Sequence, residues 1–307
     1  MIKLEKQVAI LGAAGMLGTA LREVFKYSIL LDVRVPNERI RKADIRSVDS
    51  LRAALGSLRE KDWVINAVAY KEVDNAETDK GSIQSYHLNV QGSRNLAELS
   101  SAQGFKIIHI STAYVFDGDK GLYKETDTPN PLNTYGLHKL QGEEPILEAR
   151  GIVLRTDCLY GPNGSDNFVD TMVRLAREKA AKKENLPVVF DQIGSPAYTL
   201  DLALITYALI TGQNKHKINA KGRIYHAVNN GRVSRAELAK EIINTLGINC
   251  NVEEITTGEY NERFRKGKVT AVRPRDCSLS TEKLGGLGIN PRGWREALVD
   301  YLKELRQ

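Results

Sequence analysis

The amino-acid sequence predicts an α/β protein, built on a doubly wound parallel sheet with a smaller C-terminal unit. Short apolar runs of strand length alternate with stretches of helical periodicity along most of the 307 residues. A glycine-rich loop separates the first run from the first helical stretch. Further along, a Ser-Thr pair ends an apolar run, and a tyrosine and a lysine with helical spacing follow it.

The first strand is expected at Gln7 to Leu11, followed by GAAGMLG at residues 12–18 and a helix through Phe25. Glycine permits a tight turn and a close approach of the main chain, and the helix N-terminus offers N–H groups to a pyrophosphate. The order strand, GxxGxxG, helix is the context that a dinucleotide loop requires. We therefore predict a Rossmann-type sheet that binds a nicotinamide dinucleotide along this loop, which includes Ala14.

The second strand, expected at Ser28 to Val35, carries two conflicting signals for the adenosine ribose. Asp32 lies 20 positions after Gly12, where a carboxylate binds the ribose hydroxyls and favours NADH. Arg34 would instead receive a 2′-phosphate and favour NADPH. Both cofactors stay open, with a slight preference for NADPH.

The next two elements are expected to complete the cofactor path. Asp44 and Ile45 precede a helix from Val48 to Leu58, so Asp44 either lies near the helix cap or borders the adenine. An apolar strand follows at Trp63 to Ala69, and a helix at Ile83 to Gln103 leads back to the sheet. The small side chains that end this strand would pack against ribose or nicotinamide; they are Ala67, Val68 and Ala69.

The catalytic signal lies between Phe105 and Lys139. Phe105 to Ser111 is a buried strand by pattern, which places Thr112 at the edge where open α/β sheets bind ligands. Tyr135 and Lys139 are four residues apart on one face of a helix that starts at Asn133. A nearby ammonium lowers the phenol pKa of about 10 by about 1–3 units, which favours proton transfer near neutral pH. Thr112 would share the same substrate oxygen.

The rest of the chain continues the alternation and then becomes shorter and more polar. We predict a dinucleotide-binding domain at residues 1–152 plus 186–229, and a smaller substrate-binding domain at 153–185 plus 230–307. The expected elements are strands at Ile152–Leu159, Leu186–Phe190, Arg223–Val228 and Val252–Ile255, and helices at Phe168–Lys182, Leu200–Ile210, Val233–Leu246 and Gly293–Leu305.

Composition excludes several classes of protein. With 42% hydrophobic and 27% charged residues the chain is ordinary for a globular protein, and no apolar run approaches the ~20 residues of a membrane span. We expect a cytoplasmic protein without a signal peptide. The net charge of +6 is dispersed, which suits an anionic small substrate better than nucleic acid. Three isolated cysteines and five scattered histidines give no metal-ligand spacing.

Along essentially its whole length the sequence resembles the dTDP-4-dehydrorhamnose reductase family of the extended short-chain dehydrogenase/reductase superfamily. The matching segments are GAAGMLG, INAVAYKEVDNAE, ISTAYVFDG, PLNTYGLHKLQGE, NFVDTMVRLA, DQIGSPAYTLDLA, IYHAVNNG, AVRPRDCSL and PRGWREAL. The C-terminal segments are far more specific than the glycine loop or YxxxK.

The resemblance implies a catalytic triad of Thr112, Tyr135 and Lys139. It implies cofactor contacts from Gly12, Gly15, Met16, Leu17, Asp44, Ile45, Ala67, Val68, Ala69 and Lys71, and nucleotide-sugar contacts from Asn167, Gln192 and Arg273.

The implied reaction is reduction of the 4-keto group of a deoxysugar attached to a nucleotide diphosphate. Tyr135 would protonate the oxygen, Thr112 would share it, and Lys139 would anchor the nicotinamide ribose. A nucleotide-sugar epimerase stays open because it shares the fold and the triad. A dehydratase is disfavoured, because Ala113 and Tyr114 stand where dehydratases carry an acidic pair. A non-catalytic subunit, like the regulatory subunit of methionine adenosyltransferase, is the third alternative.

The sequence also departs from the family pattern. Family members usually carry Asp in STDYVFDG and Trp in RTSWVYG, where this chain has Ala113 and Cys158. We expect a substrate pocket, bordered also by Tyr114, that prefers a bulkier or differently substituted 4-keto sugar. Some relatives bridge a dimer through magnesium, held partly by a glutamate at the position of Ala20, so no such metal is predicted here. Monomer and homodimer both stay open.

Overall fold

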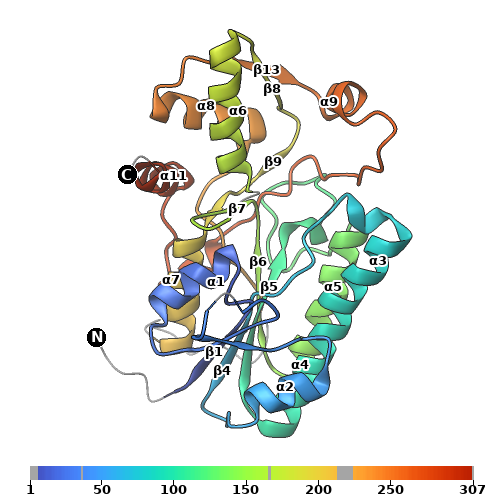
Figure 1. The fold of residues 1–307 in the computed structure, drawn as a ribbon, viewed down its shortest axis with the longest axis vertical. Coiled ribbons are helices and arrows are strands. Elements are labelled where there is room, and N and C mark those ends of the chain that lie inside the picture. Colours follow the sequence, from blue (N-terminus) through green and yellow to red (C-terminus); the bar gives the residue numbers. More distant parts are fainter. Residues whose placement is uncertain (1–5, 36, 165–166, 213–223, 306–307) are drawn as a thin grey trace.

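The structure, a computed structural model, describes residues 6–35, 37–164, 167–212 and 224–305 (Figure 1). At its centre lies a seven-stranded sheet in which every neighbouring pair is parallel, in the order β11-β6-β5-β4-β1-β2-β3. This confirms the predicted doubly wound α/β fold. The order reverses between β1 and β4, which is where such sheets open a ligand crevice. The strands are β1 (Val8–Leu11), β2 (Ile29–Asp32), β3 (Ile40–Lys42), β4 (Trp63–Asn66), β5 (Lys106–Thr112), β6 (Ile152–Thr156) and β11 (Ile224–His226).

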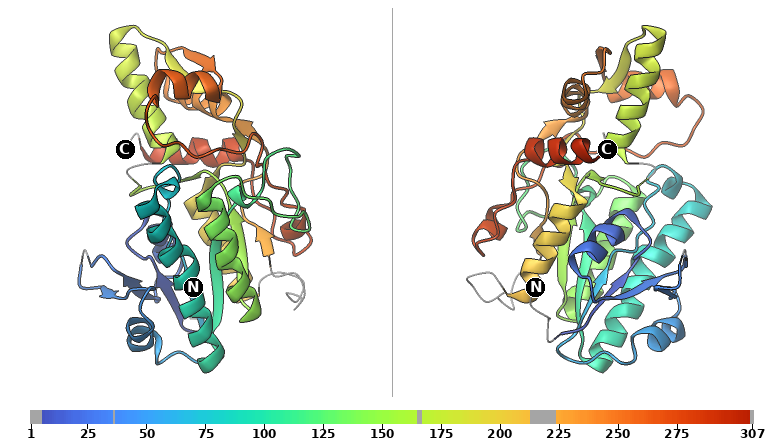
Figure 2. Two further views of the ribbon diagram at one scale, coloured as in Figure 1. Left: turned by 90° about the vertical axis from the view of Figure 1, so that its right-hand side faces the viewer. Right: turned by 60° about the vertical axis from the view of Figure 1, so that its left-hand side comes forward.

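Helices cover both faces of the sheet, because successive side chains of a buried strand point to opposite sides. In β1, Val8 and Ile10 belong to the core cluster on one face, and Ala9 and Leu11 belong to the cluster on the other. Figures 1 and 2 show α1 and α7 on the first face, and α2 to α5 on the second. These helices are α1 (Met16–Val24), α2 (Val48–Leu55), α3 (Asp79–Ser85), α4 (Gly92–Gln103), α5 (Thr134–Glu148) and α7 (Thr199–Thr211).

A smaller part lies over the carboxyl end of the sheet and has its own core (Figure 2). Three tyrosines, Tyr160, Tyr198 and Tyr301, pack there with ring centroids 5.5–5.6 Å apart. This part is made of short strands, paired in twos, and helices. They are β7 (Leu159–Tyr160), β8 (Leu186–Val189), β9 (Ile193–Gly194), β10 (Ala197–Tyr198), β12 (Val233–Ser234), β13 (Val252–Ile255), α6 (Phe168–Lys182), α8 (Arg235–Leu246), α9 (Thr257–Phe264) and α11 (Trp294–Glu304), with the short α10 (Glu282–Gly285) packed beside β11.

Two strand assignments from the sequence are wrong. Leu186–Phe190 was expected to continue the dinucleotide-binding sheet, but β8 pairs with β13 and its side chains lie in the core of the smaller part. Residues 153–156 were assigned to the smaller domain, but β6 lies in the central sheet between β5 and β11. Periodicity identifies a strand without identifying its partner, since partner choice depends on contacts between distant segments. The expected strand start at Arg223 lies outside the described residues, and the domain boundaries stay a prediction.

Several element ends differ from the expectation for local reasons. The helix expected from Ile83 starts earlier, because the Thr78 hydroxyl caps it by accepting from the Gly81 N–H at 3.0 Å. A π-helical stretch, Tyr86–Gln91, then joins α3 to α4. The strand expected at Ser28–Val35 stops at Asp32, whose carboxylate accepts the Arg34 N–H and turns the chain. Among the described residues, no helix is long and apolar enough to cross a membrane.

Candidate active site

The glycine loop joins β1 to α1 through backbone that only glycine tolerates at two points. Gly12 has φ +85°, and a Cβ there would lie 2.9 Å from the Ala67 carbonyl carbon. A Cβ on Gly18 would lie 2.1 Å from the Gly12 oxygen. Gly15 is the N-cap of α1 and no side chain caps this helix. The first-turn N–H groups of Met16 and Leu17 are therefore presented to an anion rather than to a protein side chain.

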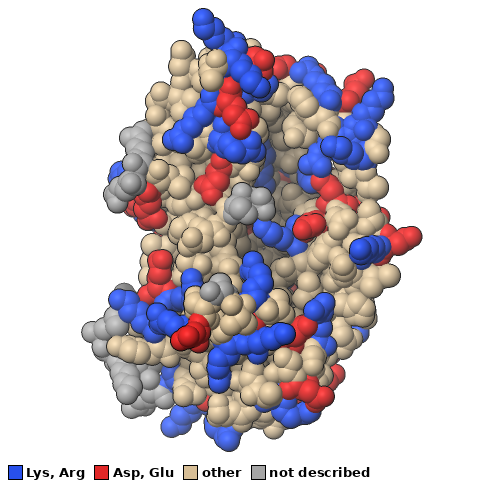
Figure 3. Space-filling view, in the orientation of Figure 1, with Lys and Arg blue, Asp and Glu red and all other residues tan. Residues whose placement is uncertain are grey.

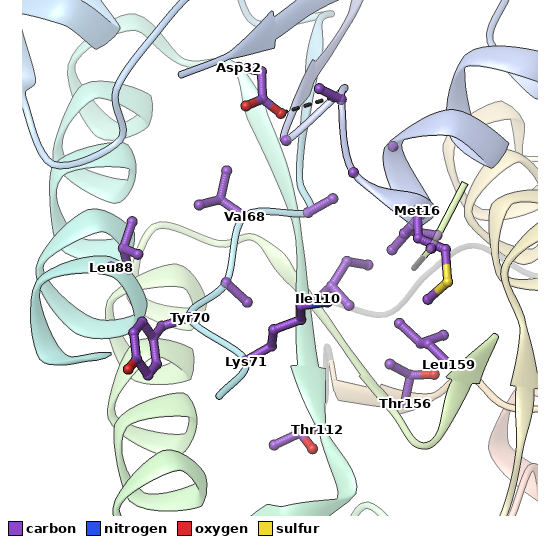
Figure 4. Close-up of a pocket in the computed structure, with 18 of the residues that line it drawn as sticks. Met16, Asp32, Val68, Tyr70, Lys71, Leu88, Ile110, Thr112, Thr156 and Leu159 are labelled. Atoms are coloured by element: carbon purple, nitrogen blue, oxygen red, sulfur yellow. Dashed lines mark hydrogen bonds between the residues drawn. The ribbon is translucent and has the colours of Figure 1, made fainter. Parts of the chain in front are cut away.

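Asp32 is buried, and its carboxylate binds the protein's own main chain. One oxygen accepts the Ala14 N–H and the other accepts the Arg34 N–H, both at 2.9 Å. Asp32 thus ties the end of β2 to the glycine loop, as the dashed line in Figure 4 marks. The Arg34 side chain, by contrast, is 67% exposed.

Thr112 and Tyr135 meet where β5 and α5 approach each other. Thr112 is the last residue of β5, and its hydroxyl oxygen accepts the Tyr114 N–H at 3.2 Å. Asn133 caps α5 by accepting from the Gly136 N–H, which fixes the turn that carries Tyr135. Burial raises the pKa of Tyr135 to about 12, although a hydrogen bond with Thr112 lowers it. The prediction that this pKa is lowered toward neutrality is therefore wrong for the protein by itself.

Lys139 explains why the phenol pKa is not lowered. Its ammonium donates to the Ile110 carbonyl oxygen at 2.6 Å and lies 3.4 Å from His109 Nε2. Burial lowers the pKa of Lys139 to about 8, and the charge of Glu143 opposes this shift. The Lys139 ammonium therefore interacts chiefly with strand β5.

A network around a fully buried ion pair joins β5 and α5, the elements that carry Thr112 and Tyr135, to β6. Arg155 on β6 donates through Nε and Nη2 to the Glu143 carboxylate on α5, at 3.0 and 2.7 Å. Ser111 donates its hydroxyl to the same carboxylate at 2.5 Å. Since Ser111 precedes Thr112 and Glu143 lies one turn after Lys139, this network ties the end of β5 to α5.

A cavity of about 760 Å³ runs from the glycine loop to these residues (Figure 4). In the space-filling view the surface is hollowed between the two parts of the molecule, and Lys and Arg side chains border the hollow (Figure 3). Predicted site residues that line the cavity are Gly12, Ala14, Gly15, Met16, Leu17, Asp32, Arg34, Ile45, Ala67, Val68, Ala69, Lys71, Thr112, Tyr135, Lys139, Cys158 and Asn167.

Five predicted residues do not line this cavity. Asp44 forms an ion pair with Arg46 at 2.7 Å, and Ala113 is fully buried in an apolar cluster. Tyr114 stacks edge-on against Tyr135, with ring centroids 6.2 Å apart. The remaining two lie farther out: Gln192 donates to Thr257 at 3.0 Å, and Arg273 pairs with Asp74 at 2.7 Å beside a second cavity of about 350 Å³.

Sequence reasoning missed several residues that line the main cavity. Thr156 ends β6 beside Thr112 and Asp157 follows it, so the rule that parallel strands end at one edge would have found them. Leu88 and Asn163 come from a helical segment and a loop that carry no local signal. The other missed residues are Gly18, Val33, Ala43, Arg46, Tyr70, Glu72, Ile110, Ser111, Leu159 and Gly164.

The fold and the site define a protein with a Rossmann-type sheet and a Thr-Tyr-Lys set at the end of the dinucleotide crevice. Residues 6–307 match the family described as RmlD substrate binding domain, and the chain belongs to this family.

The chain is 36% identical to the spore coat polysaccharide biosynthesis protein SpsK of Bacillus subtilis, over 97% of each chain. It is 35% identical to the dTDP-4-dehydrorhamnose reductase of Aggregatibacter actinomycetemcomitans, over 95% of this chain and 97% of that one. A solved structure of the dTDP-4-dehydrorhamnose reductase of Bacillus anthracis, in complex with NADP, superposes with a TM-score of 0.81 at 32% identity, covering 98% of this chain and all of that one.

Proposed function

We propose that this protein reduces the 4-keto group of a nucleotide-diphosphate deoxysugar with NADPH or NADH. The observation that carries the proposal is that one cavity joins the glycine loop to Thr112, Tyr135 and Lys139. Two relatives bear the name dTDP-4-dehydrorhamnose reductase, and one of them was solved with NADP. The nucleotide sugar is accordingly the substrate class that we assign.

The residues present fit a dinucleotide. The first turn of α1 lacks a side-chain cap, and Gly15 leaves open the space in which a larger side chain would enter the cavity. Met16 and Leu17 would hold the pyrophosphate through their N–H groups, and Ile45 would border the adenine. Ala67, Val68 and Ala69 end β4 on the opposite side of the crevice.

The geometry favours NADPH over NADH. Both Asp32 oxygens already accept main-chain N–H groups, so the carboxylate has less capacity to bind ribose hydroxyls. Arg34 and Arg46 both line the cavity, with side chains 67% and 54% exposed; Arg34 lies 3.4 Å from Asp32, and Arg46 pairs with Asp44 at 2.7 Å. Two guanidinium groups beside an occupied carboxylate suit a 2′-phosphate.

The protein's own residues then perform the proton transfer, while the bound cofactor would supply the hydride. Because burial raises the pKa of Tyr135 to about 12, its phenol is protonated at neutral pH and can donate to the carbonyl oxygen. The Thr112 oxygen accepts the Tyr114 N–H, so its own proton can be donated to the same substrate oxygen. Lys139 is protonated below its pKa of about 8, and its positive charge lines the same cavity as Tyr135.

A panel of nucleotide 4-keto sugars, incubated with NADPH or NADH, tests the proposal through the absorbance of the reduced nicotinamide. We expect net oxidation of the cofactor, faster with NADPH. An epimerase would isomerise the sugar without net oxidation, and a non-catalytic subunit would do neither. Absence of cofactor oxidation with every keto sugar would contradict the proposed reaction.

A further inference from the structure

Arg235 is a partly buried arginine beside the catalytic cavity that the reaction described above does not use. It is the first residue of α8, where the Ser234 capping box and a bond from its own N–H to the Gln192 carbonyl fix the backbone. Its Nη1 contacts the Cys158 thiol, and its guanidinium lies over the Phe168 ring, 5.2 Å from the centroid. Cys158 lines the cavity, so the guanidinium lies immediately behind the cavity wall.

This guanidinium has no carboxylate partner. Buried arginines are normally paired, as Arg155 is with Glu143 and Arg292 with Asp201. Within the described parts of the chain, no Asp or Glu oxygen lies within 4.0 Å of Arg235. Its one side-chain hydrogen-bond contact to a described residue is a thiol, which is a weak acceptor, so most of its five N–H donors are left for another group.

The charges around Arg235 indicate what that group is. Asp157 is the nearest carboxyl on the same wall, but its oxygen accepts the Ser195 N–H at 2.9 Å. Burial raises the pKa of Asp157, and the charge of Arg235 opposes that shift. Arg273 pairs with Asp74 at 2.7 Å, and Arg265 shares the same carboxylate at 3.1 Å, so both guanidiniums have a carboxylate partner that Arg235 lacks among the described residues. One free guanidinium next to a carboxyl suits a singly charged carboxylate better than a doubly charged phosphate.

The position relative to the catalytic pair indicates which part of the substrate carries this carboxylate. The charge of Arg235 acts on the Tyr114 phenol, and the Tyr114 ring stacks edge-on against Tyr135. Arg235 therefore lies on the reacting side of the cavity, where the sugar ring must be placed for its keto group to reach Thr112 and Tyr135.

We propose that Arg235 binds a carboxylate on the sugar, so that the substrate is an acidic nucleotide sugar. The inference rests on the proposed function and assigns its substrate class. A planar guanidinium binds a carboxylate through two parallel N–H bonds, which the carboxylate would make by taking the place of the Cys158 thiol contact. A charged hydrogen bond of this kind changes affinity by about tenfold or more.

The test compares binding of UDP-glucuronic acid with UDP-glucose, and of the two corresponding dTDP sugars, to the NADPH-loaded protein by calorimetry. Within each pair the nucleotide diphosphate is constant, so its contribution cancels. We expect the wild type to bind the uronate at least about tenfold more tightly than the neutral sugar. The Arg235→Gln variant should lose this preference, and Arg235→Lys should keep part of it because it retains the charge without the planar fork. NADPH affinity, measured on the same samples, shows that each variant is folded.

Arg232→Gln is the matched control, since it removes the same charge three residues away from an arginine that already pairs with Asp276 at 2.5 Å. It should retain the preference. Equal weakening of both sugars by Arg235→Gln would assign Arg235 to the diphosphate and overturn the proposal. A wild type without a preference for the uronate, whether it binds both sugars or neither, would overturn it as well. If the protein reduces neutral keto sugars but shows no preference for the uronate, only the role of Arg235 is rejected. If it binds the uronate but reduces no keto sugar, the proposed reaction is rejected.

Discussion

The two walls of the cavity are built in different ways. On the cofactor wall, strand ends and helix starts carry the side chains, and the charged groups that hold it together are satisfied within the protein: Asp32 by two N–H groups, Lys139 by a carbonyl, Glu143 by Arg155. On the substrate wall, Cys158 lies in the turn after β6, and Arg235 is the first residue of α8. Cys158 has φ +39°, a conformation that costs free energy for a residue other than glycine, and Arg235 lacks a carboxylate partner within the described residues.

This difference in construction indicates that the cofactor wall serves the reaction chemistry and the substrate wall serves the choice of substrate. A hydride and a proton must be transferred within a few tenths of an ångström, so the groups that do this sit on rigid elements joined by a buried network. Substrate preference, by contrast, changes through a few side chains on loops, at little cost to the fold. The following experiments test whether the two walls differ in this way.

The largest expected effect is the loss of NADPH binding on the cofactor wall, caused by Gly15→Val. Gly15 has φ −83°, which any residue adopts, and a Cβ there would lie 3.3 Å from the Gly12 oxygen, so the loop should accommodate it with a small shift. The new side chain would occupy the path of the pyrophosphate, and calorimetry should detect no NADPH binding at concentrations that saturate the wild type. Undiminished NADPH affinity would refute the placement of the cofactor. Gly18→Val is the contrasting variant, because a Cβ 2.1 Å from the Gly12 oxygen should disrupt the loop itself.

Glu143→Gln should destabilise the protein by about 3–5 kcal/mol, because it leaves Arg155 buried without its counter-charge. Urea unfolding measures the loss. The exposed pair Arg174 and Glu178 provides the control: Glu178→Gln should cost only about 0.3–0.5 kcal/mol. A similar loss of unfolding free energy in the two variants would show that the buried network stabilises the protein no more than an exposed ion pair does.

Tyr135→Phe should lower turnover by at least ~10²-fold, the usual scale of losing a general acid. NADPH affinity should stay nearly unchanged, since the ring and its edge-on contact with Tyr114 remain. Steady-state kinetics and calorimetry measure the two quantities. Turnover at the wild-type level would remove Tyr135 from its assigned role.

On the substrate wall, we expect the kcat/KM for dTDP-4-dehydro-L-rhamnose to be reduced by ~10-fold or more. Cys158 lines the cavity at the position where the family resemblance implies a tryptophan, so we expect a smaller wall to pack on this neutral sugar. Ala113, buried away from the cavity, contributes less to this change than the sequence comparison predicted. A kcat/KM within the ordinary range of ~10⁴–10⁸ M⁻¹ s⁻¹ would mean that the pocket has not diverged.

A pH-dependent stability difference is expected at Lys139. Its folded pKa of about 8 lies below the ordinary lysine value of 10.5, so the unfolded chain binds the proton more tightly and folding is penalised below pH 8. The penalty disappears as the pH rises from about 8 to 10.5. Lys139→Met should therefore have a higher urea midpoint than the wild type at pH 7, with the difference shrinking toward pH 10.5. A pH-independent difference would contradict the shifted pKa.

The sequence by itself determined the parts of this protein whose signal is local. The loop GAAGMLG, the strand end at Thr112 and the spacing of Tyr135 and Lys139 each depend on a few neighbouring residues. Glycine conformation, strand length and helical period fix them before any distant contact forms. All three lie in the predicted elements, and they line one cavity.

Tertiary structure decided everything that depends on which distant segments meet. Whether β8 joins the central sheet or β13 follows from packing of the smaller core, which periodicity does not encode. The pKa values of Tyr135 and Lys139 follow from burial and from the Ile110 carbonyl, although their spacing predicted a direct interaction. Arg235 and Cys158 are 77 positions apart and touch only because α8 folds over the end of β6, since burial and charge pairing are properties of the assembled chain.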